Sequence, residues 1–161
     1  MSFRMFDIQE AKPIGDRALA YAARKGVVLV AAAGNEGSPR PPAPFPDPNP
    51  LVINVAATTP AGNKAGFSNW GPWVEIGAPG TAIYSTIRDG YASYQGTSMA
   101  SPVVAGVVGL LFESGRCTTS SCATQRLFVG ATRNPSLARY WPGGLVVNAC
   151  RAVAPSFQHC N

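Results

Sequence analysis

The sequence predicts an α/β fold built on a parallel sheet. Residues 27–33 (VVLVAAA) form a continuous apolar run with no polar face, which is typical of a strand that is buried on both sides. Residues 52–57 (VINVAA) indicate a second buried strand, and segments with helical spacing lie before the first strand and well after the second. Because strands, helices and loops alternate along the chain, we expect helices to cover a mostly parallel sheet.

The first part of the chain is predicted to contain one helix, two strands and a long loop. The helix is expected over residues 15–25, where alanines and a leucine recur at helical spacing and Gly26 supplies a stop signal. Seven prolines between residues 38 and 50 exclude a helix interior or a paired central strand. This proline-rich segment is therefore expected to be a surface loop that joins the two strands.

The rest of the chain is predicted to hold short strands followed by helices. A short strand is expected at residues 73–76, and two further extended pieces at 82–86 and 91–95. The longest apolar helix is expected over residues 98–114 and, being hydrophobic on nearly every side, should be buried through the middle of the domain. Two more helices are expected, at residues 121–131 and 147–153.

Composition excludes several classes of protein. Of 161 residues, 46% are hydrophobic and 13% charged, so the chain has enough apolar surface to fold as one domain. Thirteen Lys and Arg against eight Asp and Glu give a net charge of +5, but they do not cluster as a nucleic-acid footprint would. The longest uncharged apolar stretch, residues 96–112, is too short to cross a bilayer comfortably. We therefore expect neither nucleic acid nor membrane as a partner.

The four cysteines lie in the last third of the sequence. Three disulfide pairings are possible: the local one joins Cys117 to Cys122 and Cys150 to Cys160, and free thiols are the alternative. A zinc site that also uses His159 is disfavoured, because the sequence lacks paired C-x2-C spacing. Disulfides would imply an oxidising compartment and a secreted protein. The N-terminal segment lacks the apolar core of a secretion signal, so on that reading the chain begins downstream of its natural start.

Two motifs suggest chemistry. The segment GTSMASP, residues 96–102, places Ser98 in the first turn of the long helix, where unpaired N–H groups and the helix dipole stabilise negative charge. The alternative is that Ser98 only caps the helix. The segment AAAGNEG, residues 31–37, could lie along an extended peptide, with Asn35 offering its amide to an oxyanion. A Gly-Asn pair by itself is more often a turn signal.

Together these motifs resemble the C-terminal part of the catalytic domain of subtilisin-like serine proteases, the subtilases. The resemblance runs from about Ile14 to Cys150, so residues 1–161 are interpreted as a partial catalytic domain with residues 1–13 poorly assigned and 154–161 as a tail. It implies a three-layer parallel sheet flanked by helices, of which this chain holds the C-terminal half. Four blocks carry it: ALAYAARKGVVLVAAAGNEG, NPLVINVAATTPAGNKAGFSNWGP, VEIGAPGTAIYST and YQGTSMASPVVAGVVGLL.

The resemblance also implies roles for individual residues. Ser98 matches the nucleophile of the family, and its backbone N–H would be one oxyanion donor. Asn35 matches the side-chain donor of the oxyanion hole. Ala32, Ala33 and Gly34 match the strand segment that helps to wall the substrate pocket. The implied activity is hydrolysis of peptide bonds through an acyl-enzyme.

The base that would activate Ser98 is missing from its expected place. In the family, a histidine and its aspartate lie upstream of the Ala-Ala-Gly-Asn strand. Here the only histidine is His159, in the C-terminal tail, and Asp7 and Asp16 lack the family's surroundings. Because a serine is a poor nucleophile without a base, the isolated chain is expected to be inactive. It is also expected to be marginally stable, since the strand at residues 27–33 would become an edge.

The expected partners are a polypeptide substrate and a missing N-terminal half. No cofactor or metal ligand is predicted: calcium is common in the family, but Asp47, Glu75 and Asp89 are far apart and no calcium-loop motif occurs. Two other functions stay open. One is a catalytically dead module that binds extended peptides along residues 31–34. The other is an α/β-hydrolase elbow at Gly96-x-Ser98-x-Ala100, disfavoured because the only acid after Ser98 is Glu113, on the same predicted helix, and no continuous apolar strand leads into Gly96.

Overall fold

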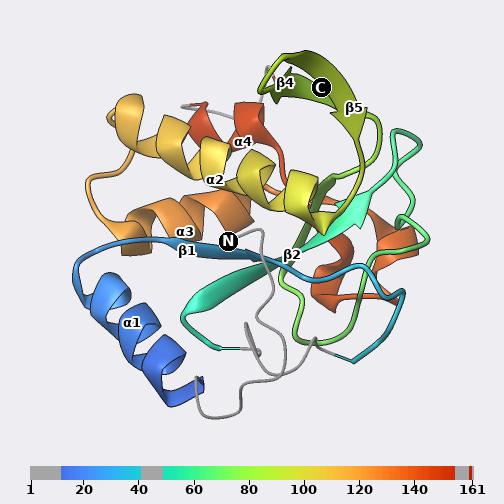
Figure 1. Cartoon of the computed structure of the whole chain (residues 1–161). Helices are drawn as coiled ribbons and strands as arrows, with labels where there is room; N and C mark the ends of the chain where they lie inside the picture. The colour runs from blue at the N-terminus through green and yellow to red at the C-terminus, as the bar shows by residue number, and fades with distance from the viewer. Residues whose placement is uncertain (1–11, 41–48, 155–159, 161) are drawn as a thin grey trace.

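A computed structural model describes residues 12–40, 49–154 and 160 (Figure 1), and it confirms the α/β prediction. Five strands form one sheet in the order β1-β2-β3-β7-β6, in which β1, β2, β3 and β7 run parallel and β6 is antiparallel. The strands are β1 (Leu29–Ala32), β2 (Val52–Thr58), β3 (Ile76–Pro79), β6 (Thr132–Arg133) and β7 (Leu145–Val146).

Alternate residues of the strands build the cores on the two faces of the sheet. On one face, Val30 and Val55 pack in a core with residues of α2 (Thr97–Glu113) and α3 (Ser120–Gly130), beside which lies α4 (Ala149–Val153). On the other face, Ala31 packs with Leu19 of α1 (Lys12–Arg24), and Ala56 packs with Trp141. The sheet is therefore the middle of three layers, as predicted.

Several boundaries differ from the sequence prediction for local reasons. The first strand begins two residues late, because the N–H of Val27 still bonds to the carbonyl of Ala22 at the end of α1. The strand expected at 73–76 begins only at Ile76, since the N–H of Val74 closes a turn on Gly71. The proline-rich loop lies largely outside the described residues. The short strands β6 and β7 and the 3-10 turns at residues 135–137 and 142–144 were not predicted.

The expectation that the long helix is buried on every side is wrong. One face of α2 packs on the sheet, α3 and α4, but the opposite face is exposed and Leu110 has half of its surface in solvent. The described chain supplies packing partners on one side of this helix only. The exposed residues include Pro102, Ala105, Gly106, Gly109 and Leu110.

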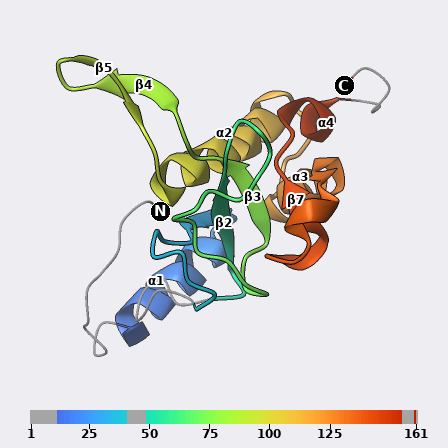
Figure 2. The same cartoon turned by 90° about the vertical axis from the view of Figure 1, so that its right-hand side faces the viewer.

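The cysteines form the two local disulfides, Cys117–Cys122 and Cys150–Cys160, so that pairing is confirmed. The first ties the segment after α2 to the first turn of α3. A hairpin of β4 (Ile83–Ile87) and β5 (Gly90–Tyr94), close to the predicted extended pieces, projects from the body of the molecule (Figure 2). Within the described residues, no helix has the length and apolar character needed to span a membrane.

Close packing between α3 and α4 yields a stability prediction. A Cβ added at Gly130 would lie 2.6 Å from the backbone nitrogen of Ala152, which cannot move without shifting α4. We expect Gly130→Ala to lower the free energy of unfolding by about 1–3 kcal/mol through overpacking. Gly106→Ala is the matched control: its Cβ meets nothing within 4 Å, so it should stabilise the exposed helix by about 0.5–1 kcal/mol. Urea titrations followed by circular dichroism would measure both, and equal effects of the two substitutions would contradict this packing.

Candidate active site

Ser98 is the second residue of α2 and is half-buried. The residue that caps this helix is Gly96, with a φ of 152°. The alternative that Ser98 is merely the helix cap is therefore wrong. Its place in the first turn instead puts it where the helix dipole favours negative charge.

Asn35 lies just beyond the carboxyl end of β1, which ends at Ala32. Its side-chain Oδ1 accepts two hydrogen bonds from Thr97, one from the backbone N–H and one from the hydroxyl, each 2.9 Å long. The Thr97 hydroxyl in turn accepts a bond of 3.0 Å from the N–H of Gly34. Because Oδ1 is occupied in this way, the orientation of the Asn35 amide is fixed.

The two predicted oxyanion donors converge beside Gly96. A Cβ placed on Gly96 would lie 3.4 Å from Asn35 Nδ2 and 3.6 Å from the backbone nitrogen of Ser98. The sequence separates these residues widely, and the fold joins them because the carboxyl end of β1 meets the N-terminus of α2. An amide N–H2 group beside a helix N-terminus can stabilise an oxyanion.

The predicted wall segment is held firmly by the protein itself. The N–H of Ala33 donates to the carbonyl of Val55 on β2, and its carbonyl accepts from the side chain of Asn69. Gly34 bonds to Thr97 through its N–H and to the backbone N–H of Asn69 through its carbonyl. A peptide that paired with Ala33 or Gly34 would have to share groups that are already bonded.

Comparison with known proteins shows to which family the chain belongs. A family model described as the Subtilase family matches residues 7–134. The chain belongs to the subtilase family. It is 44% identical over 138 residues to thermitase of Thermoactinomyces vulgaris, covering 85% of this chain and 48% of thermitase. It is 40% identical over 141 residues to an extracellular protease of Xanthomonas campestris pv. campestris, covering 82% of this chain and 24% of that protein.

A solved protease structure shows the same fold. The prenylagaramide maturation protease PagA superposes with a TM-score of 0.73 at 28% identity, covering 86% of this chain and 54% of PagA. This chain thus spans about half of thermitase and a quarter of the Xanthomonas protease. The family match leaves the α/β-hydrolase alternative without support.

Two residues at the site were missed by the sequence analysis. Thr97 lies inside the GTSMASP motif, so a signal for it was present, but its bonds to Asn35 depend on the fold. Asn69 lies in a segment, FSNWG, that shows no chemical pattern by itself. It is buried against the turn that carries Asn35.

The candidate acids and base are not gathered at Ser98 in the described part of the chain. His159 and Asp7 fall outside the described residues. Asp16 lies on the surface of α1, where it bonds to Lys12 at 2.7 Å and to Asn49 at 3.2 Å. The hydrogen bond from Lys12 holds the pKa of the Asp16 carboxyl below its ordinary value. Asp16 is thus one partner of a surface ion pair.

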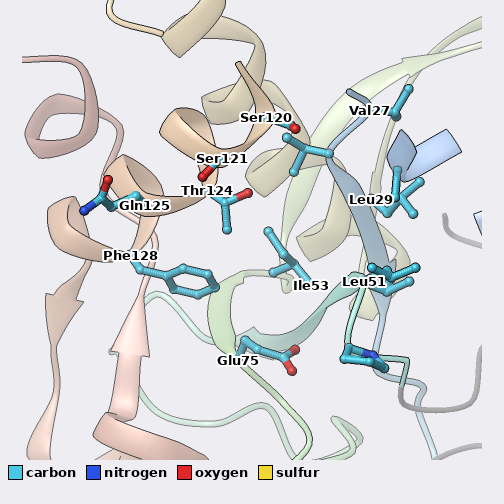
Figure 3. Close-up of a pocket in the computed structure, with 14 residues that line it drawn as sticks. Val27, Leu29, Leu51, Ile53, Glu75, Ser120, Ser121, Thr124, Gln125 and Phe128 are labelled. Atoms are coloured by element: carbon cyan, nitrogen blue, oxygen red, sulfur yellow. The ribbon is translucent and has the colours of Figure 1, made fainter. Parts of the chain in front are cut away.

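One cavity lies at the opposite end of the sheet from Ser98. It has a volume of about 640 Å³ and is lined by the first residues of β1 and β2 and by α3 (Figure 3). Glu75 lies on its wall, and its Oε2 accepts a bond of 2.6 Å from the N–H of Asn54. Burial raises the pKa of Glu75 above its ordinary value. None of the predicted site residues lines this cavity.

No metal site emerges from the part of the chain that the structure describes. Within residues 12–40, 49–154 and 160, no three His, Cys, Asp or Glu side chains group in a way that could hold a metal ion. Of the three carboxylates considered for calcium, Asp47 falls outside these ranges, Glu75 precedes β3, and Asp89 lies in the turn of the β4–β5 hairpin.

The raised pKa of Glu75 predicts a pH-dependent stability difference. The ordinary pKa of this carboxyl is 4.5, and burial makes its charged form less favourable in the folded protein than in the unfolded chain. As the pH rises from below 4.5 through the raised folded-state pKa, the wild-type protein should therefore lose stability relative to Glu75→Gln. Thermal melts at pH 4 and pH 7 would test this: the variant should melt higher than wild type at pH 7 and similarly at pH 4.

Asp16→Asn is the control of opposite sign. The pKa of wild-type Asp16 is lowered in the folded protein, so its carboxylate stabilises the fold at neutral pH. This contribution is lost as the pH falls through the lowered folded-state pKa. A Glu75→Gln protein that melts below wild type at pH 7 would contradict the inferred desolvation of this carboxyl.

Proposed function

We propose that this chain carries the nucleophile and the oxyanion hole of a serine endopeptidase. Ser98 is the nucleophile, and Asn35 Nδ2 and the N–H of Ser98 are the oxyanion donors. The observation that supports this most is the convergence of those two nitrogens beside Gly96, in a chain of the subtilase family. Polypeptides are the substrate class, as expected for a protease fold.

The chemistry follows from the position of each group. The Oγ of Ser98 attacks the carbonyl carbon of the peptide bond while a base removes its proton, and charge develops on the carbonyl oxygen. That oxygen meets donors at the positive end of α2, and these are already oriented because Thr97 holds the Asn35 amide. The base gives the proton to the leaving amine, whose departure leaves an acyl-enzyme on Ser98 that water then hydrolyses.

The base and its carboxylate partner are proposed to come from a polypeptide that corresponds to the preceding part of the family's domain. Two surfaces support this. The exposed face of α2 is formed by small and apolar residues, and β1 is the last strand on its side of the sheet in the described chain. Covering both with further structure would bury apolar surface next to Ser98. The two disulfides and the extracellular protease among the relatives support a secreted protein.

Complementation tests this function. The chain would be mixed with the part of thermitase that precedes the matched region, and hydrolysis of a chromogenic peptide amide would be followed by the release of its chromophore. We expect activity from the mixture and none from either polypeptide alone. In the mixture, Ser98→Ala should abolish turnover, and Asn35→Ala should lower kcat by about 10² to 10³-fold, the effect of losing one oxyanion donor.

The outcomes separate the alternatives. Peptide binding by the chain with no recovery of activity in any mixture would favour the dead binding module. Full activity of the Ser98→Ala mixture would contradict the assignment of the nucleophile. Rapid labelling of Ser98 by a fluorophosphonate in the isolated chain would contradict its expected inactivity.

The exposed face of α2 predicts where the complementing polypeptide binds. Leu110→Glu places a charge on this face and should weaken association at least tenfold, since a buried unpaired charge is costly. Val129→Glu on α3 is the matched control, because Val129 is 60% exposed and Leu110 50% exposed. Titration calorimetry would measure both affinities. Equal affinities of the two variants would show that this face is not the contact surface.

A further inference from the structure

The turn that presents Asn35 is fastened to a second loop, residues 67–70. The turn comprises Ala33 to Ser38, and all of its residues except Asn35 form hydrogen bonds to this loop. The Asn35 side chain bonds instead to Thr97 on α2. The bonds to the loop join Ala33 O to Asn69 Nδ2 (3.0 Å), Gly34 O to Asn69 N (3.0 Å), Glu36 N to Asn69 Oδ1 (3.0 Å), Ser38 N to Asn69 Oδ1 (2.9 Å) and Gly37 N to Phe67 O (2.7 Å).

The side chain of Asn69 uses its whole hydrogen-bonding capacity on this turn. An asparagine amide offers two donor hydrogens and two acceptor lone pairs. Nδ2 donates to the carbonyl of Ala33 and to Oε2 of Glu36, while Oδ1 accepts from the N–H groups of Glu36 and Ser38. Asn69 is only 1% exposed, so water cannot readily replace these bonds if the side chain is removed.

Gly34 allows this close contact. Its φ is +98°, and a Cβ there would lie 2.5 Å from Asn69 Nδ2. The glycine before Asn35 therefore provides both the backbone conformation and the space that Asn69 needs.

Asn69 is itself fixed by the sheet. The Oγ of Ser68 accepts from the N–H of Ala57 on β2 at 2.9 Å and donates to the carbonyl of Asn69 at 3.0 Å. The ammonium group of Lys64 donates to the carbonyls of Ala65 and Ser68. A continuous set of bonds thus runs from β2 through Ser68 and Asn69 to both sides of Asn35.

We propose that Asn69 is a positioning residue for the oxyanion hole: it fixes the backbone on both sides of Asn35, so that Thr97 needs only to orient the amide. The inference that Asn69 controls the position of Asn35 stands on geometry alone. Its consequence for catalysis rests on the proposed function of Asn35.

The first test does not depend on activity. The side-chain amide signals of Asn35, assigned by their disappearance in Asn35→Ala, would be followed in nitrogen–proton correlation spectra of the ¹⁵N-labelled full chain. Asn69→Ala should shift or broaden these signals. Asn69→Asp keeps both acceptor bonds but loses the donations to Ala33 O and Glu36 Oε2, and it places a second carboxylate beside that of Glu36. It should therefore also shift these signals, and it serves if the alanine variant does not fold.

Asn54→Ala is the matched control. Asn54 is also a buried asparagine, 2% exposed, but it bonds to Glu75 at the other end of the sheet. It should lower stability without changing the Asn35 signals. Unchanged Asn35 signals in both Asn69 variants, or equal changes in Asn54→Ala, would overturn the proposal.

The second test uses the complemented mixture described above. Asn69→Ala should lower kcat about tenfold or more, less than the roughly 10² to 10³-fold loss from removing an oxyanion donor, with a smaller change in KM. If Asn69 acts through Asn35, Asn69→Ala should have no further effect on kcat in an Asn35→Ala background. Additive losses would show that Asn69 acts elsewhere. An inactive wild-type mixture would count against the proposed function and leave the spectroscopic result to decide the role of Asn69.

Discussion

The candidate site depends on one junction, formed by the two hydrogen bonds from Thr97 to Asn35. It joins the residue that opens α2 to the turn that follows β1, and so connects two segments that are distant in the sequence. The junction is available because the carboxyl end of a parallel strand and the start of a helix packed on the sheet meet at the same edge. Asn35 is exposed on a surface turn, and without these bonds its amide would be free to rotate.

The layers of the fold give this junction its support. Val30 and Val55 pack against the helices on one face of the sheet, and Trp141 packs against Ala56 on the other face. The buried polar residues Ser68, Asn69 and Thr97 connect these layers to the turn at Asn35. The other side of α2 carries no comparable packing in the described chain. The molecule therefore combines firmly held candidate oxyanion donors with an exposed helix face beside the same serine.

Residue patterns predicted the layers and most elements, because strand burial and helix spacing are local features of the sequence. The motif around Ser98 indicated the candidate site. FSNWG lies in one of the four blocks that resemble the family, but the role of Asn69 was not predicted. Its four side-chain hydrogen bonds go to a turn more than 30 residues away, and that contact depends on the fold. The exposed face of α2 was mispredicted for a related reason. Hydrophobicity on every side indicates what a helix can bury, whereas actual burial depends on which partners are present.

The most direct measurement is a crystal structure of the chain with its complementing polypeptide after reaction with a peptidyl phosphonate. The account predicts phosphorus bonded to Ser98 Oγ and one phosphonate oxygen within hydrogen-bonding distance of both Asn35 Nδ2 and the N–H of Ser98. A phosphonate attached to another residue, or one whose oxygens lie away from Asn35, would contradict it.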